Sequence, residues 1–242
     1  MTDGLTARQA EILKALITEY IETAKEVGSL ALEKKYNLGV SPATIRNEMA
    51  NLTKMRYLKQ PHTSAGRVPT PLAMKFYINQ LMEEKSLSVM DEVKTKEKVW
   101  DSRLDLDKLM EEATQALAEK TNSMAVAATD DGDVWRAGHS HVFESPEFFD
   151  IQVCQNVFSY FEEAKKVHEL FFEHLTGLSL VEVLFGEDLD WPFFDQVGVV
   201  GTRFELGNKK GALAVIGPFR QNYMEVIPTV RYFRNLIEEL TH

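Results

Sequence analysis

The chain of 242 residues has a single cysteine, Cys154, so it can form no intrachain disulfide and no site that needs several thiolates. Such scarcity is typical of a reducing compartment, and we expect a cytoplasmic protein. No apolar run approaches the ~18–20 residues that span a bilayer, so we expect no membrane partner. The opening stretch MTDGLTARQAEILK lacks a basic patch followed by an apolar core, and we expect no signal peptide.

Signals for catalysis or for a bound cofactor are also missing. No phosphate-binding loop of the form G-x-x-x-x-G-K-[ST] occurs, and no catalytic triad can be assigned. Cys154 lies in an apolar helical run, where a buried, unreactive thiol is the simpler interpretation. GHSH places His139 and His141 on one face of a predicted strand, a spacing open to metal binding, but no third ligand is anchored nearby. We therefore expect no enzyme, no cofactor and no metal site.

The net charge of −10 is unevenly distributed along the chain. Residues 1–85 carry 12 Lys and Arg against 9 Asp and Glu, a net of +3, whereas residues 86–242 carry 15 against 28, a net of −13. Within residues 41–80, six basic residues accompany a single acid, Glu48. Such an asymmetry suggests an anion-binding module joined to an acidic one.

Capping signals and apolar periodicity predict two helices before residue 40. The first lies in LTARQAEILKALITEYIETA, where Thr6 and Gln9 have the spacing of a capping box. A short second helix is expected to begin with Ser29 as its cap, and the sequence NLG ends it. The apolar side chains expected to be buried by this helix are Leu30, Leu32 and Tyr36.

The helix predicted at residues 41–54 has two different faces. Ser41 is its expected N-cap, and Pro42 takes the first helical position, where a missing N–H is harmless. The buried stripe consists of Ile45, Met49 and Leu52. The opposite face is small and polar, so it can approach a flat surface closely. It holds Ala43, Asn47, Ala50, Asn51 and Lys54, with Thr44 and Arg46 on its flanks.

The stretch YLKQPHTSAGRVPT predicts a β-hairpin, because YLKQ and RVPT are short β-like arms around a turn rich in Pro, Ser and Gly. Thr70 and Pro71 then repeat the cap-and-proline signal at the start of a fourth helix. The order helix, helix, tight turn, helix, hairpin, helix indicates a winged helix-turn-helix. The alternatives are a solvated turn in place of a DNA-contacting hairpin, and a winged helix that binds protein.

The third helix and the hairpin carry side chains suited to DNA. The major groove admits an α-helix, in which Asn can pair with adenine and Arg with guanine. We expect base contacts from Thr44, Arg46, Asn47 and Asn51. We expect contacts to phosphates or to the minor groove from Ser41, Lys59, Thr63, Ser64 and Arg67. Lys54 and His62 complete the predicted DNA-binding set, although His62 is also suited to bracing the hairpin.

The remaining sequence predicts an α+β domain at residues 106–242, preceded by a charge-rich helical linker at residues 83–105. Its strands are expected in SMAVAAT, VWRAGHSHVF, LSLVEVLFG, VGVVGTRFEL and GALAVIGP. GEDLDW is expected to be a solvated loop before a short helix, with cation binding by its acidic residues as the alternative. Pro228 is expected near the first turn of the closing helix. An aromatic core is expected, with a ligand pocket or partner surface as the alternative, from Phe143, Phe148, Phe149, Phe158, Phe161, Phe171 and Phe172.

Five segments resemble the HrcA family of heat-inducible transcription repressors. The N-terminal ones are LTARQAEILKALITEYIETAKEVGS, YNLGVSPATIRNEMANL and, above all, YLKQPHTSAGRVPT. GHSHVFESPEF resembles the middle of that family and GALAVIGPFRQNYMEVIPTVRYF its closing segment. The resemblance makes residues 1–82 a DNA-binding domain, residues 41–54 the reading helix and residues 62–67 the wing.

The same resemblance implies a repressor that binds an inverted-repeat operator upstream of chaperone genes as a homodimer. It also implies a GAF-like C-terminal domain and modulation by a GroEL-type chaperonin. One departure is visible, because AVAATDDGDVWRAGHSH runs almost directly from a core strand to the middle motif. We therefore expect the family's inserted dimerisation segment to be missing and the GAF-like domain to be truncated. A regulator gated by a small molecule and a protein-interaction module remain the alternative functions.

Overall fold

The computed structural model describes residues 4–241, which divide into an N-terminal unit that ends at Glu83 and a C-terminal unit that begins at Glu84. Residues 1–3 and 242 lie outside the described residues. They are the ends of the predicted domains 1–82 and 106–242, and residues 1–3 also begin the stretch in which no signal peptide was expected. Among the helices of residues 4–241, none combines the length and the apolar character needed to cross a bilayer.

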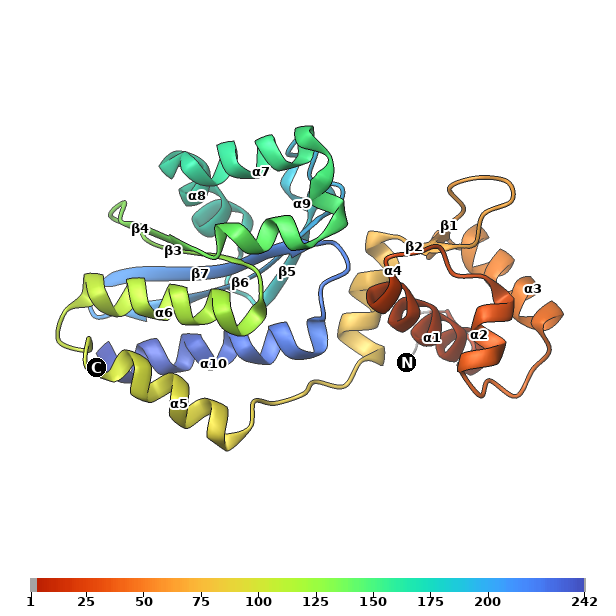
Figure 1. Cartoon of the computed structure of the whole chain (residues 1–242), viewed down its shortest axis with the longest axis horizontal. Helices are drawn as coiled ribbons and strands as arrows, with labels where there is room; N and C mark the ends of the chain where they lie inside the picture. The colour runs from red at the N-terminus through yellow and green to blue at the C-terminus, as the bar shows by residue number, and fades with distance from the viewer. Residues whose placement is uncertain (1–3, 242) are drawn as a thin grey trace. The chain divides into compact units, whose positions relative to one another are not determined.

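The N-terminal unit has the predicted winged helix-turn-helix order (Figure 1). Thr6 and Gln9 form the predicted capping box, and Ser41 and Thr70 accept backbone N–H groups as the N-caps of α3 and α4. The elements are α1 (Ala7–Thr23), α2 (Ser29–Lys35), α3 (Pro42–Lys54), β1 (Leu58–Lys59), β2 (Val68–Pro69), α4 (Pro71–Phe76) and a π-helical turn, η1 (Tyr77–Leu81).

The core of this unit follows the predicted apolar stripes, with one correction at α2. Ile45, Met49 and Leu52 of α3 are buried as predicted, and Ile12, Leu13, Leu16 and Ile17 of α1 are buried as well. Ser29 is the first residue inside α2, and Gly28, which has no side chain to offer, occupies the cap position. Leu30 is 60% exposed and Tyr36 is half-buried, because a helix of seven residues turns only one apolar position, Leu32, fully inward.

The C-terminal unit is built on a five-stranded antiparallel sheet in the order β4-β3-β7-β6-β5. Gly207, with φ of +63°, lies in the tight turn between the two longest strands, β6 (Val197–Leu206) and β7 (Lys209–Pro218). The other strands are β3 (Met124–Thr129), β4 (Val134–Ala137) and β5 (Glu182–Phe185). The helices are α5 (Val89–Trp100), α6 (Leu106–Thr121), α7 (Ile151–Glu162), α8 (Ala164–Glu169), α9 (Gly186–Leu189) and α10 (Tyr223–Thr241). The predicted α+β class is confirmed.

Helices cover both faces of this sheet, with α6 and α10 on one side and α7 and α8 on the other (Figure 1). The alternation of side chains along each strand explains both layers. In β3, Val126 points to the core under α7, where it joins Val157 and Phe161, whereas Ala125 and Ala127 are buried on the opposite side of the strand. A sheet that is apolar on both faces requires a helical layer on each of them.

The predicted linker contains α5, which is attached to the C-terminal unit. Lys98 pairs with Glu119 of α6 at 2.7 Å, and Lys96 pairs with Glu239 of α10 at 2.6 Å. The hydroxyl of Tyr232 in α10 donates to the backbone oxygen of Glu92 in α5 at 2.7 Å. The chain from Val89 onwards therefore packs within the C-terminal unit.

The prediction that His139 and His141 share a strand face is wrong. β4 ends at Ala137, and both histidines lie in a 3-10 helix, η2 (His139–Glu144). The strand stops because Gly138 turns the chain with φ of +73°, at a point where a Cβ atom would lie 2.4 Å from the backbone oxygen of Ser123. His141 instead faces Glu144, with 3.1 Å between Nδ1 and Oε1.

Three smaller expectations in the C-terminal unit also need correction. The first residues of GEDLDW form α9 itself, which begins at Gly186, rather than a loop before it. Pro228 is the sixth residue of α10 and lies beyond its first turn. Of the seven phenylalanines, Phe143 and Phe149 are 55% and 69% exposed. The others are buried (Phe148, Phe161, Phe171) or half-buried (Phe158, Phe172).

Cys154 provides a direct test of the packing of α7. Its side chain is buried, and burial raises the pKa of the thiol above its usual value, so little reactive thiolate forms. We expect native protein at pH 8 to resist alkylation by iodoacetamide and to incorporate one label per chain after unfolding in guanidinium. Reduced glutathione in the same solution provides the control for reagent activity. Native labelling at the rate of that free thiol would contradict the burial of Cys154.

Candidate nucleic-acid interface

The outer face of α3 is polar and positively charged. Arg46, Asn47, Asn51 and Lys54 are exposed on it, while its apolar stripe fills the core of the N-terminal unit. Thr44 is half-buried, and its hydroxyl lies 3.0 Å from that of the cap residue Ser41. The first turn of the helix is thereby fixed, and the side chains that follow it project from a rigid element.

One acidic residue, which the sequence interpretation did not assign to the site, interrupts this face. Glu48 accepts a hydrogen bond from Gln9 of α1 at 3.0 Å and one from Asn51 at 3.4 Å. Gln9 is fixed by the capping box of α1, where its side chain accepts from the backbone N–H of Thr6. The network therefore orients the amide of Asn51. The hydrogen bond between Asn51 and Glu48 could have been expected from their i, i+3 spacing in the helix. The hydrogen bond between Gln9 and Glu48 could not, because it joins two helices.

The turn of the hairpin is ordered by its own hydrogen bonds. Gln60 donates through Nε2 to the backbone oxygens of Thr63 at 2.9 Å and Ala65 at 3.0 Å. The backbone N–H of Ala65 donates to the oxygen of His62 at 2.9 Å. His62, Thr63 and Ser64 are exposed at its tip, so their side chains are accessible to an external partner.

The base of the wing is joined to the segment before α2. The backbones of Val27 and Arg67 exchange two hydrogen bonds of 2.9 Å in an antiparallel bridge. Gly66 packs so closely there that a Cβ atom would lie 2.6 Å from the backbone oxygen of Val27. Val27 thus pairs with the hairpin like a third strand of a single residue, which the sequence did not predict.

Arg67 differs from the other basic residues predicted to contact DNA. It is half-buried, and its Nε donates to the hydroxyl of Thr53 in α3 at 3.1 Å. Its Nη1 donates to the backbone oxygens of Ala65 at 3.4 Å and Gly66 at 3.2 Å. Its guanidinium therefore binds groups of the protein itself.

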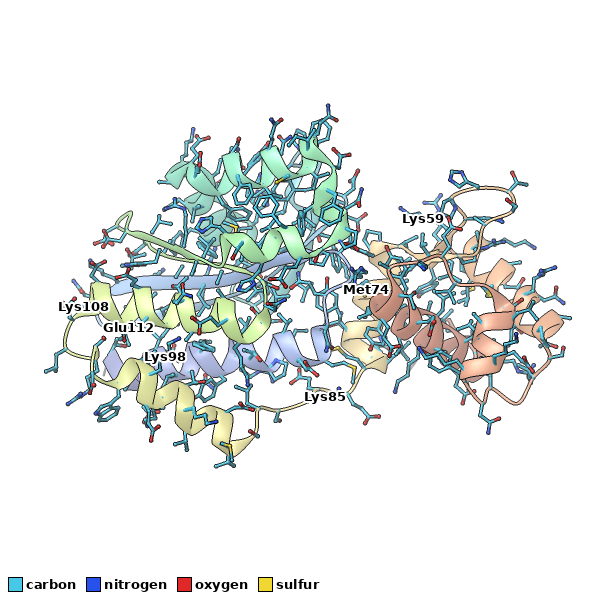
Figure 2. All side chains as sticks on the ribbon, viewed as in Figure 1. Lys59, Met74, Lys85, Lys98, Lys108 and Glu112 are labelled. Atoms are coloured by element: carbon cyan, nitrogen blue, oxygen red, sulfur yellow. The ribbon has the colours of Figure 1, made fainter. Side chains whose placement is uncertain are left out.

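A groove of about 460 Å³ separates the wing from α3 and the start of α2. Its lining includes two guanidinium groups and two hydroxyls of the wing, from Arg46, Arg67, Thr63 and Ser64. Lys59, labelled in Figure 2, lies at the base of the hairpin, on β1. Within residues 4–241, no ion pair involves Arg46, Lys54 or Lys59, so their charges are available to an anionic partner.

The groove brings together four of the eleven residues that the sequence singled out, namely Arg46, Thr63, Ser64 and Arg67. The exposed Arg46 of α3 and the exposed Thr63 and Ser64 at the tip of the wing border this groove, while Asn47, Asn51, Lys54 and Lys59 are exposed outside its lining. Amide and guanidinium groups at this spacing suit base edges, and hydroxyl and ammonium groups suit phosphates. Across the part of the chain that the structure describes, no cluster of three or more His, Cys, Asp or Glu side chains is arranged to hold a metal ion.

Comparisons with known proteins identify the family of the chain. Residues 71–227 match the family model described as the HrcA protein C terminal domain. The heat-inducible transcription repressor HrcA of Carboxydothermus hydrogenoformans is 25% identical over 335 residues, covering 96% of this chain and 97% of that protein. The repressor of the same name from Clostridium botulinum strain Eklund 17B is 45% identical over 123 residues, 50% of this chain and 36% of that protein.

Length and fold add two further findings. The alignment with the Carboxydothermus protein runs over 335 residues, more than the 242 of this chain, so it contains positions that this chain lacks. A crystal structure titled as a hypothetical protein superimposes with a TM-score of 0.74 and 17% identity over 98% of both chains. That likeness supports the fold of the chain.

Proposed function

Since the chain belongs to the HrcA family, we propose that it is a sequence-specific DNA-binding repressor of heat-shock genes. The relatives to which it is similar are named heat-inducible transcription repressors. The observation that supports this most directly is the exposed polar face of α3, which carries Arg46 and Asn47 and whose Arg46 lines the groove beside the wing. Both α3 and the wing lie within residues 41–80, the one strongly basic stretch of an otherwise acidic chain. We further propose that the protein acts in the cytoplasm.

The proposed contacts divide into two groups by their chemistry. Arg46, Asn47 and Asn51 lie on the exposed face of α3 and are suited to base edges in the major groove, with Thr44 at its flank. The side chains suited to phosphates or to the minor groove are Ser41, Lys54, Lys59, His62, Thr63 and Ser64. The exposed position of His62 at the tip favours a DNA contact for it over a bracing role.

An inverted-repeat operator requires a protein with two-fold symmetry, so we propose that the chain binds as a homodimer. The C-terminal unit, which carries the acidic excess and the exposed surface of α5, is the part we assign to this contact. Modulation by a GroEL-type chaperonin is a further proposal that rests on family membership.

Selection of bound duplexes from a random library, followed by footprinting, tests the proposed function. We expect the selected sequences to converge on an inverted repeat and the footprint to protect both half-sites. The same selection with a GroEL-type chaperonin added tests that partner. A selection without convergence, combined with a footprint that protects no repeat, would favour a protein-interaction module instead.

Arg46→Ala is expected to weaken binding to the selected repeat by about 1–3 kcal/mol and to relax the sequence preference at one position of each half-site. The reason is that Arg46 is exposed and makes no ion pair among residues 4–241, and that in the proposed complex it contacts a base edge. Titration of the selected and a scrambled duplex by fluorescence anisotropy measures both effects. Lys59→Ala is the matched control, because the loss of a phosphate contact weakens binding to both duplexes alike. Equal losses on the two duplexes for both variants would contradict this division of roles.

A further inference from the structure

We propose that Arg67 is a positioning residue, which holds the wing at a fixed place beside α3 and makes no contact with DNA. This inference rests on the proposed function, but it assigns to Arg67 a role different from that of the exposed basic residues. It follows from the partners of the guanidinium group, all of which belong to the N-terminal unit itself.

The hydrogen bond to Thr53 has a fixed direction. The hydroxyl of Thr53 donates to the backbone oxygen of Met49, one turn earlier in α3, at 2.8 Å. Its only proton is therefore used, and its oxygen is left as the acceptor for Nε of Arg67 at 3.1 Å. A hydrogen bond from a charged donor is stronger than one between two neutral groups.

The same residue joins three separate elements of the unit. Its Nε reaches α3, its Nη1 holds two carbonyl groups of the wing, and its backbone pairs with Val27 before α2. This side chain therefore ties the wing directly to the reading helix. Because α3 and the wing contact the same duplex in the proposed complex, an error in the distance between them weakens the contacts of the uncharged hydroxyl groups at the tip of the wing.

Lys59 provides the contrast on the same hairpin. It is exposed and makes no ion pair among residues 4–241, as a phosphate-binding ammonium group should be before it meets DNA. Arg67 is half-buried, and its Nε and Nη1 already donate to acceptors of the unit, so a phosphate contact through either nitrogen would break one of these hydrogen bonds. The two cations therefore predict different responses to salt, since each neutralised phosphate contributes about 0.9 to the slope of log affinity against log salt.

The decisive variant is Thr53→Val, which keeps the shape and the net charge but removes the acceptor. We expect it to weaken binding to the selected duplex by roughly tenfold, from the loss of a hydrogen bond to a charged group, while the salt slope stays at the wild-type value. Arg67→Met should also leave that slope unchanged, and the double variant should lose little beyond either single one. Lys59→Ala should lower the slope by about 1, and Thr53→Ser, which restores the hydroxyl, should recover the affinity.

A second measurement needs no DNA. Amide hydrogen exchange of Val27, Ala65 and Arg67, whose N–H groups form the bridge and the turn, should be faster in Thr53→Val and unchanged in Lys59→Ala. The inference is wrong if Thr53→Val keeps both wild-type exchange and wild-type affinity, or if Arg67→Met lowers the salt slope as far as Lys59→Ala does. If the wild-type chain bound no duplex, the proposed function would fail, and the exchange rates would still decide whether Arg67 holds the wing.

Discussion

Gly66→Ala is expected to reduce DNA binding by about a hundredfold, although the helices of the N-terminal unit remain folded. The added Cβ atom would lie 2.6 Å from the backbone oxygen, 2.7 Å from the carbonyl carbon and 2.9 Å from the nitrogen of Val27. Three backbone atoms cannot rotate away as a side chain does, so the wing must move. Overpacking a closely packed site costs about 1–3 kcal/mol. If the upper end of this range must be spent to hold the wing in its DNA-binding position, affinity falls by about a hundredfold.

Gly28→Ala is the matched control for this variant. Gly28 is also close to Val27, but its φ of −98° suits any residue and no atom lies within 4 Å of its would-be Cβ. We expect DNA affinity close to that of the wild-type chain, measured by anisotropy with far-UV circular dichroism as the check on folding. Wild-type affinity in Gly66→Ala would show that the wing tolerates displacement, and would contradict the importance given to its contact with Val27.

Phe161→Ala is expected to lower the free energy of unfolding of the C-terminal unit by about 3–5 kcal/mol. The ring is fully buried between α7 and the sheet, with Trp191 and Phe194 at centroid distances of 6.2 Å and 6.3 Å. Its removal leaves a cavity that rigid strands on one side cannot fill. With roughly 2–4 °C lost per kcal/mol, the melting temperature should fall by about 6–20 °C.

Tryptophan fluorescence reports this transition selectively, because all three tryptophans, at positions 100, 135 and 191, lie in the C-terminal unit. Phe149→Ala is the matched control, since that ring is exposed and its loss should leave the midpoint within a degree or two of wild type. A midpoint of Phe161→Ala equal to that of Phe149→Ala would contradict the described core.

Local signals along the chain predicted the N-terminal unit well. Capping at Thr6, Ser41 and Thr70 depends on atoms within three residues of each other, and the apolar stripe of α3 follows from helical periodicity alone. The hairpin could also be predicted, because Pro, Ser and Gly restrict the turn locally. The separation of charge between the two halves is a property of composition and needed no structure.

Expectations that depended on where an element stops were less secure. The strand predicted through GHSH ends at Ala137 because Gly138 must fit against Ser123, a residue of another segment. Ser29 was expected as a cap from its residue type, yet it is the first residue inside α2 and Gly28 occupies the cap position. At Gly138 a contact between segments outweighed the local preference.

By itself the sequence determined which helix carries the polar face, which turn forms the wing and that positive charge gathers around them, since these are properties of neighbouring residues. Only the tertiary structure decided what each side chain does there. Val27 and Thr53, the partners of Arg67, are 40 and 14 residues away from it along the chain, and Gln9 is 39 residues from Glu48. Hydrogen-bond partners so distant in sequence meet only after the helices have packed, and their meeting distinguishes Arg67, whose guanidinium binds groups of the protein, from the exposed Arg46.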